Sequence, residues 1–297
     1  MMEQPIVFNS EGKALLGILH TPDTPSRSTG IVLVVGGPQT RVGSHRQFVF
    51  LARALCRSGY PVLRYDYSGM GDSEGEKSDY LAGSADLDCA IKTLKEHVPA
   101  VDEVALWGLC DAASLILLYL SQERAETIGT IFLLNPWVRQ SQSEAQVYLK
   151  NYYLRRLRDP EFWKKLLSFR FDWKGSFLSL LSTVRKAVAV KKLQSSAADS
   201  ALHASWQTFT EDGYVSAMAK GLQRYAGKCY LVLSGNDLTA DEFRLLLAND
   251  PAWKALIDQK VDETLTLKDA NHTFSSEMWR SEVETFCVES ISVNNAK

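Results

Sequence analysis

Short runs rich in Val, Ile and Leu alternate with longer segments of helical period along most of this 297-residue chain. Continuous apolar runs of this kind are typical of strands that are buried on both faces. Their alternation with helices favours a mostly parallel sheet with helices on both faces, because each parallel crossover needs a connecting segment. The predicted strands are residues 14–21, 30–37, 60–67, 103–109, 127–135, 228–235 and 261–268. The predicted helices are residues 45–58, 79–98, 111–122, 241–250 and 276–290.

The alternation stops after Asn135 and Pro136. The following segment has a helical pattern throughout, and residues 138–226 contain 15 Lys and Arg against 7 Asp and Glu. Their formal charge of +8 leaves −10 for the rest of the chain. This change in composition predicts an α/β core and an insertion. We assign residues 1–136 and 227–297 to the core, and residues 137–226 to a helical cap inserted between late strands.

The composition argues against several classes of protein. A formal net charge of −2 gives no general reason to expect a nucleic-acid partner. No run approaches the roughly 18 apolar residues of a membrane span, and the N-terminus lacks the pattern of a secretory signal. The five cysteines are scattered, without the paired spacing of zinc or redox sites. We therefore expect a cytoplasmic protein with reduced thiols, no membrane span, and no metal or cofactor.

One predicted strand runs directly into a helix through Gly108, Cys110 and Ala112. This G-x-C-x-A segment resembles the G-x-S-x-G nucleophile elbow of α/β-hydrolases, with Cys in place of Ser. Small residues two positions before and after the nucleophile allow strand and helix to approach closely. We therefore predict that Cys110 is a nucleophile, in preference to a buried structural cysteine. The helix N-terminus would favour its thiolate, whereas the carboxylate of Asp111 would oppose it.

His272 is the predicted general base. It lies in DANHTFSS, between the last predicted strand and the last predicted helix, where a loop can carry the imidazole over the elbow. The chain order of nucleophile, acid and histidine is that of the α/β-hydrolase fold. Among the other histidines, only His45 lies near the same edge of the predicted sheet.

The acid is expected in GNDLTADEF, the loop that follows the strand at 228–235. Asp237 comes directly off this strand and is the predicted carboxylate that orients the imidazole. Asp241 is the alternative, although it precedes an apolar helix and resembles an N-cap or first-turn residue.

Acyl transfer also needs donors for the developing oxyanion. One is expected to be the backbone N–H of Asp111, and the other should come from VGGPQ at 35–39. Pro38 has no N–H, so we predict Gly37 as the second donor, with Gln39 as the alternative. A plain tight turn remains an equally good interpretation of GGP.

A further glycine-rich segment, DYSGMGDSEG, resembles a D-x-x-G-x-G-x-S loop of α/β-hydrolases. It contains Asp66, Gly69, Gly71 and Ser73. In those relatives the loop is mainly structural, so Ser73 is not expected to be a nucleophile.

Taken together, these motifs resemble one bacterial group, the type 1 α/β-hydrolases of the exosortase A system. The resemblance covers nearly the whole chain, through GGPQTRVGSHRQF, RYDYSGMGDSEG, WGLCDAAS, LLNPWVRQ, YLKNYYLRRL, FWKKLL, SGNDLTADEF and NHTFSS. Such proteins are encoded beside exopolysaccharide and exosortase genes. The resemblance implies an α/β-hydrolase fold with a Cys110, Asp237 and His272 arrangement, and it does not identify a substrate.

The predicted function is hydrolysis of an ester or thioester through an acyl-thioenzyme intermediate. The substrate would be a small or carrier-linked acyl compound, which includes an acylated saccharide, bound near Gln39, Trp137 and Arg139. The basic cap favours an anionic substrate, with Arg155 and Arg156 as weaker candidates than Arg139, although such charges are more often solvated. Two alternatives stay open: acyl transfer to a sugar hydroxyl of an exopolysaccharide, and a non-catalytic binding protein. The sequence does not determine the oligomeric state.

Overall fold

The computed structural model of the chain describes all residues except 24–26, 78, 124–125, 127, 140–205 and 295–297. No helix among the described residues is long and apolar enough to cross a membrane.

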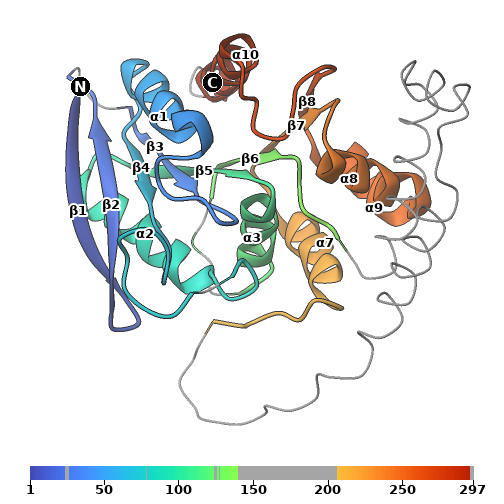
Figure 1. The fold of residues 1–297 in the computed structure, drawn as a ribbon, viewed down its shortest axis with the longest axis horizontal. Coiled ribbons are helices and arrows are strands. Elements are labelled where there is room, and N and C mark those ends of the chain that lie inside the picture. Colours follow the sequence, from blue (N-terminus) through green and yellow to red (C-terminus); the bar gives the residue numbers. More distant parts are fainter. Residues whose placement is uncertain (24–26, 78, 124–125, 127, 140–205, 295–297) are drawn as a thin grey trace, which may run out of the picture. The chain divides into compact units, whose positions relative to one another are not determined.

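An eight-stranded sheet forms the centre of the described residues (Figure 1). Its strands are β1 (Met2–Ser10), β2 (Lys13–Thr21), β3 (Thr29–Val34), β4 (Val62–Tyr65), β5 (Glu103–Leu109), β6 (Thr130–Leu134), β7 (Lys228–Ser234) and β8 (Glu263–Leu267). They lie in the order β1-β2-β4-β3-β5-β6-β7-β8. The pairs β1–β2 and β2–β4 are antiparallel, and every pair from β4 to β8 is parallel. The mostly parallel sheet predicted from the sequence is confirmed.

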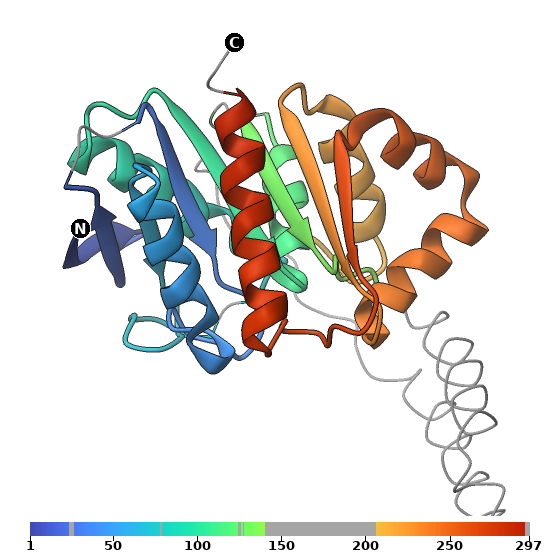
Figure 2. The same ribbon diagram turned by 90° about the horizontal axis from the view of Figure 1, so that it is seen from above.

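Helices cover both faces of the sheet (Figures 1 and 2). One face carries α1 (Gln47–Arg57) and α10 (Glu277–Asn294), and the other carries α2 (Ser84–His97), α3 (Asp111–Leu120) and α7 (Tyr214–Arg224). The short η1 (Ser44–Arg46) precedes α1, while α8 (Leu238–Asn249) and α9 (Pro251–Lys260) lie at the β8 end of the sheet. Because both faces are covered, every residue of β3, β4 and β6 is buried, as the apolar runs predict.

Two elements were not predicted from the sequence. The edge strand β1 is mostly exposed and lacks a continuous apolar run; it forms a hairpin with β2 through Glu11 and Gly12, both at positive φ. The helix α9 begins at Pro251 after Asp250, whose Oδ1 accepts the backbone N–H groups of Ala252 and Trp253. Asp followed by Pro is a helix-start signal that could have located α9.

Most of the predicted cap, together with Arg155 and Arg156, lies outside the described residues. At the described end of the range 137–226, α7 packs against α3. Gly221 allows this contact, because a Cβ at that position would collide with the carbonyl oxygen of Leu117. The cap itself stays a prediction.

Candidate active site

Cys110 occupies the single residue between β5 and α3, at the carboxyl edge of the sheet. Its backbone has φ 65 and ψ −125, a strained conformation for a residue with a side chain. A Cβ at Gly108 would lie 2.7 Å from the carbonyl carbon of Ala112, so only glycine fits there without displacement. Ala112 is 1% exposed. The small residues around Cys110 therefore produce a turn that presents the thiol at the sheet edge.

His272 and Asp237 lie in the loops that follow β8 and β7. Nδ1 of His272 is 2.9 Å from Oδ2 of Asp237. Asp237 is buried, and its carboxylate also accepts the backbone N–H of Ala240, which caps α8. Both contacts fix the carboxylate, so Asp237 can hold the imidazole with Nδ1 protonated and Nε2 available as a base. Among the described residues, the ring of His272 has this hydrogen bond to Asp237 and none to the thiol of Cys110.

A buried amide network supports the His272 loop, and sequence reasoning did not find it. Nδ2 of Asn135 donates to Oγ of Ser234 at 2.9 Å and to the carbonyl of His272 at 3.2 Å. Oδ1 of Asn135 accepts the N–H of Ser234 at 2.8 Å, and Oγ of Ser234 donates to the carbonyl of Asn271 at 2.9 Å. Asn135 and Ser234 are both fully buried. Polar residues at the ends of two apolar strands were the signal available in the sequence.

The electrostatic surroundings of Cys110 favour a neutral thiol. Burial raises the pKa of this thiol to about 12, and the carboxylates of Asp111 and Asp237 act in the same direction. A hydrogen bond from the backbone N–H of Asp111 and the charge of Arg139 act against them. The helix N-terminus therefore does not outweigh burial and the neighbouring acids.

The side chain of Asp111 lies between the two expected oxyanion donors. Its Oδ2 accepts the backbone N–H of Gly37 at 2.7 Å. Gly37 has a φ of 60 and its carbonyl accepts the hydroxyl of Tyr67 at 2.6 Å, so this peptide is held in place. Oδ1 of Asp111 is buried and forms no hydrogen bond of normal geometry within the described part of the chain. Burial raises the pKa of Asp111, whereas the N–H groups of Gly37, Ala112 and Asp111 itself lower it.

Gln39 faces away from this arrangement. Its N–H donates to the carbonyl of Gly36 at 3.4 Å, and its side-chain Oε1 accepts hydrogen bonds from Ser44 and Gln47. The structure thus places Gly37, and not Gln39, opposite Asp111.

Trp137 and Arg139 lie beside the elbow. The N–H of Trp137 donates to the carbonyl of Cys110 at 3.2 Å. The guanidinium of Arg139 stacks on the indole of Trp137, 4.4 Å from the ring centre, and Nε donates to Oε1 of the buried Glu242 at 3.0 Å. The positive charge of Arg139 is therefore largely balanced by Glu242.

The alternative site residues have other surroundings. His45 is exposed in η1, and Asp241 contacts Nη1 of Arg244 within the first turns of α8, at 3.1 Å. The carboxylate of Asp66 accepts the backbone N–H groups of Arg41 and Asp72, while Oγ of Ser73 donates to the Asp66 carbonyl at 2.7 Å. These contacts organise the glycine-rich turn.

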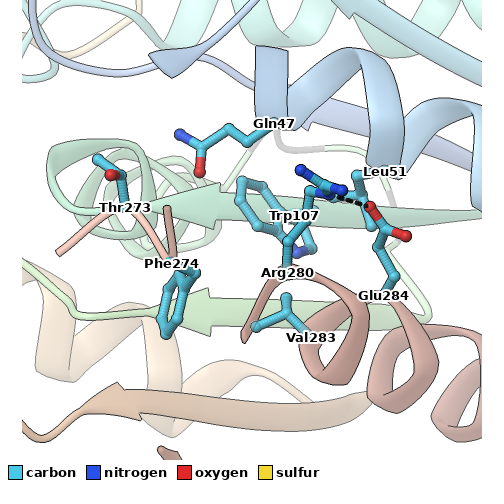
Figure 3. A pocket seen from close by; sticks show the side chains of 8 residues that line it. All are labelled: Gln47, Leu51, Trp107, Thr273, Phe274, Arg280, Val283 and Glu284. Atoms are coloured by element: carbon cyan, nitrogen blue, oxygen red, sulfur yellow. Dashed lines mark ion pairs between the residues drawn. The ribbon is translucent and has the colours of Figure 1, made fainter. Parts of the chain in front are cut away.

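A cavity borders the His272 loop on the side of α1 and α10 (Figure 3). It is lined by Gln47, Leu51, Trp107, Thr273, Phe274, Arg280, Val283 and Glu284. Arg280 and Glu284 form an ion pair with Nε and Oε1 3.5 Å apart, and burial raises the pKa of Glu284. Phe274 is 4% exposed and anchors the segment just after His272. None of the residues predicted as site residues lines this cavity.

Comparisons with known proteins identify the fold. The family model described as alpha/beta hydrolase family matches residues 31–284. The esterase Pf2001 of Pyrococcus furiosus has 16% identity and a TM-score of 0.60, with 97% of this chain and 89% of that chain covered. Est1E of Butyrivibrio proteoclasticus, solved with ferulic acid bound, has 13% identity and a TM-score of 0.57, with 97% and 99% covered.

An alpha-beta serine hydrolase homologue from Coxiella burnetii has 13% identity and a TM-score of 0.55, with 98% of each chain covered. No curated protein sequence matches the chain.

Proposed function

The chain belongs to the alpha/beta hydrolase family, and we propose on this basis that it hydrolyses carboxylic esters or thioesters with Cys110 as its nucleophile. The observation that carries the proposal is the hydrogen bond between His272 and Asp237, in loops at the same sheet edge as the strained Cys110 turn. This set of a nucleophile, a base and an acid that orients the base is the arrangement that acyl transfer requires.

In the first step, Sγ of Cys110 attacks the acyl carbon while Nε2 of His272 accepts the thiol proton. The carbonyl double bond opens into an oxyanion, for which the N–H groups of Asp111 and Gly37 are the proposed donors. Collapse of the tetrahedral intermediate expels the alcohol or thiol, which takes the proton from His272. The product is a thioester on Cys110.

In the second step, water replaces the leaving group. His272 accepts a proton from water as the water oxygen attacks the thioester carbon. The tetrahedral intermediate then collapses, and Cys110 leaves as the thiol after protonation by His272. The carboxylic acid is released, and the net reaction consumes one water. Asp237 stabilises the imidazolium in both steps and keeps Nδ1 as its donor.

Base catalysis is essential in this scheme because burial raises the pKa of the Cys110 thiol to about 12. A neutral thiol is a poor nucleophile, so proton transfer to His272 must accompany attack. Catalytic hydrogen bonds are often made only after substrate binds, which accounts for the lack of a thiol–imidazole hydrogen bond among the described residues.

Trp137 and Arg139 are the proposed contacts for the substrate beside the elbow. The N–H of Trp137 donates to the Cys110 carbonyl, and the charge of Arg139 lowers the pKa of the Cys110 thiol. The motif resemblance supports a role beside bacterial exosortase and exopolysaccharide systems, in which an acylated saccharide is a candidate substrate. The scattered cysteines support the proposed cytoplasmic location. Transfer of the acyl group from Cys110 to a sugar hydroxyl would use the same first step.

Mass spectrometry tests the proposal directly. Purified protein is mixed with activated esters and thioesters, and intact and peptide masses are recorded. We expect an acyl adduct on the peptide that contains Cys110, and none in Cys110→Ala. Cys56, Cys229 and Cys287 serve as internal controls because they are buried, and Cys89 is the control of intermediate exposure, the same class as Cys110. Turnover that persists in Cys110→Ala would overturn the proposal.

A labelled acyl group then distinguishes the two acceptors. Release as the free acid in the presence of added oligosaccharide supports hydrolysis, whereas a labelled glycan would identify a transferase.

A further inference from the structure

In the structure without substrate, the carboxylate of Asp111 occupies one of the two N–H groups proposed to bind the oxyanion. Oδ2 of Asp111 accepts the N–H of Gly37 at 2.7 Å, the donor that the proposed reaction assigns to the substrate oxygen. A developing oxyanion and a carboxylate cannot share one N–H, since both are acceptors and both carry negative charge. The Asp111 side chain must therefore leave Gly37 before the tetrahedral intermediate can be stabilised.

The displaced carboxylate remains close to the substrate, because residue 111 is bonded to the nucleophile residue. Within the described part of the chain, no Lys or Arg side chain forms an ion pair with the Asp111 carboxylate; the N–H groups of Gly37, Ala112 and Asp111 and the charge of His272 lower its pKa. Oδ1 is buried without a hydrogen bond of normal geometry among the described residues. A group on the substrate that donates to this carboxylate would offset the loss of the Gly37 hydrogen bond.

The cavity around Asp111 also has an acidic lining. A small cavity there is lined by Val35, Gly36, Gly37, Tyr67, Asp79, Tyr80, Gly83, Asp111 and Leu115. It contains a second carboxylate, Asp79, whose Oδ1 accepts the N–H of Leu81 at 2.9 Å, and two tyrosines, Tyr67 and Tyr80. Burial raises the pKa of both tyrosines, and the carboxylates of Asp111 and Asp79 act in the same direction. This surface opposes an anionic acyl group and favours a cationic one.

Resting on the proposed function, we propose that Asp111 is a specificity-determining residue that favours acyl groups with an ammonium group next to the reacting carbonyl. The ammonium group pairs with the carboxylate as the carbonyl oxygen takes its place on Gly37. The expected substrate class is thus an aminoacyl ester or thioester. A neutral acyl group must displace Asp111 without this compensation, and an acyl group with its own carboxylate meets two like charges.

Three 4-nitrophenyl esters of nearly equal size test this preference. Their acyl groups come from glycine, which is cationic, from propionic acid, which is neutral, and from malonic acid as its half-ester, which is anionic. Assays at about pH 6.5 keep the α-amino group charged. Values of kcat/KM are compared between wild type and Asp111→Asn, and each variant-to-wild-type ratio cancels the intrinsic reactivity of the ester. We expect the preference for glycinate over propionate to fall about tenfold in Asp111→Asn, the effect of losing one partly screened charge pair.

Two further variants sharpen the test. In Asp111→Ala the N–H of Gly37 is free, so the rate with propionate should rise while the glycinate preference disappears. Asp79→Asn removes a carboxylate from the same cavity that is not hydrogen-bonded to Gly37, and it should reduce the preference less than Asp111→Asn. Thermal unfolding midpoints check that each variant is folded.

The outcomes separate this inference from the proposed function. If no ester acylates Cys110, the proposed function fails. If Cys110 is acylated but Asp111→Asn leaves the ratio of glycinate to propionate unchanged, only the role of Asp111 is overturned. Preference for the malonate half-ester, or an equal or larger effect of Asp79→Asn, would also overturn it.

Discussion

Nδ1 of His272 lies 2.9 Å from Oδ2 of Asp237, although 35 residues separate the two in the chain. The contact exists because β7 and β8 are parallel neighbours, so that the loops at their carboxyl ends meet. The same edge carries the turn between β5 and α3. The parallel sheet thus converts three distant segments into one candidate site.

Asp237→Asn should lower kcat by about ten-thousandfold, because an amide in place of the carboxylate favours the wrong imidazole tautomer. Asn still caps a helix well, so α8 should keep its N-terminus and the protein its stability. Steady-state kinetics with an activated ester measures the effect. Asp241→Asn is the matched control and should retain near-wild-type kcat; the reverse ranking would show that Asp241 orients the base.

Alkylation of Cys110 by iodoacetamide should be slow at neutral pH, because burial holds the pKa of its thiol at about 12. The rate is expected to rise about tenfold per pH unit up to pH 10, since the thiolate fraction rises by that factor below the pKa. Peptide mass spectrometry follows the reaction, with free cysteine as a reference thiol whose rate levels off earlier. A plateau for Cys110 below about pH 9 would contradict this pKa.

Removal of the Cys110-adjacent charge should make the thiol more acidic. Asp111→Asn is expected to shift the alkylation profile toward lower pH, because the carboxylate of Asp111 raises the thiol pKa. The same alkylation series measures the shift, and an unchanged profile would show that burial alone determines it.

Asn135→Ala should reduce both stability and turnover. It removes the partners of the Ser234 N–H and the His272 carbonyl inside a buried region, which is expected to cost about 2–4 kcal/mol of unfolding free energy. Denaturant unfolding gives the stability, and kcat reports whether the imidazole has moved. Ser234→Ala keeps the hydrogen bond from Asn135 to the His272 carbonyl, so it should have the smaller effect on stability and on kcat. A normal kcat in folded Asn135→Ala would show that the network does not position His272.

His20 should make the fold sensitive to acid. It is fully buried, and its Nε2 accepts a hydrogen bond from Nε of Arg64 at 2.9 Å, which requires a neutral ring. Burial, with help from the charge of Arg64, lowers the pKa of His20 to about 4. The unfolded chain then binds more protons between about pH 4 and 6.5, so this contribution is complete above that range and is lost as the pH falls through it.

At about pH 4, the free energy of unfolding should be lower by about 3 kcal/mol than at neutral pH because of His20. His20→Gln keeps an acceptor for Arg64 but does not titrate. Urea unfolding of both proteins from pH 4 to 7 should therefore show the smaller pH dependence in the variant. Equal slopes would rule out His20 as the acid-sensitive group.

Residue patterns predicted the fold where the pattern was long and local. β3, β5 and β7 each contain a run of apolar residues, and the helices between them have clear amphipathic or apolar character. β1 was missed because an exposed edge strand needs no continuous apolar sequence. Asp237 was preferred to Asp241 because it comes directly off a strand, and Gly37 to Gln39 because Pro38 lacks an N–H. In the structure Asp237 contacts His272 and Gly37 contacts Asp111.

The sequence by itself determined the buried strands of the sheet and where the strained turn lies, because apolar runs and the lack of side-chain bulk at Gly108 and Ala112 act over a few residues. Only the tertiary structure decided that Asn135 holds the His272 loop and that the carboxylate of Asp111 rests on Gly37. Hydrogen bonds depend on the positions and directions of atoms to within about half an ångström. For residues 74 positions apart, such as Gly37 and Asp111, packing of the whole sheet sets those positions, and no local pattern encodes them.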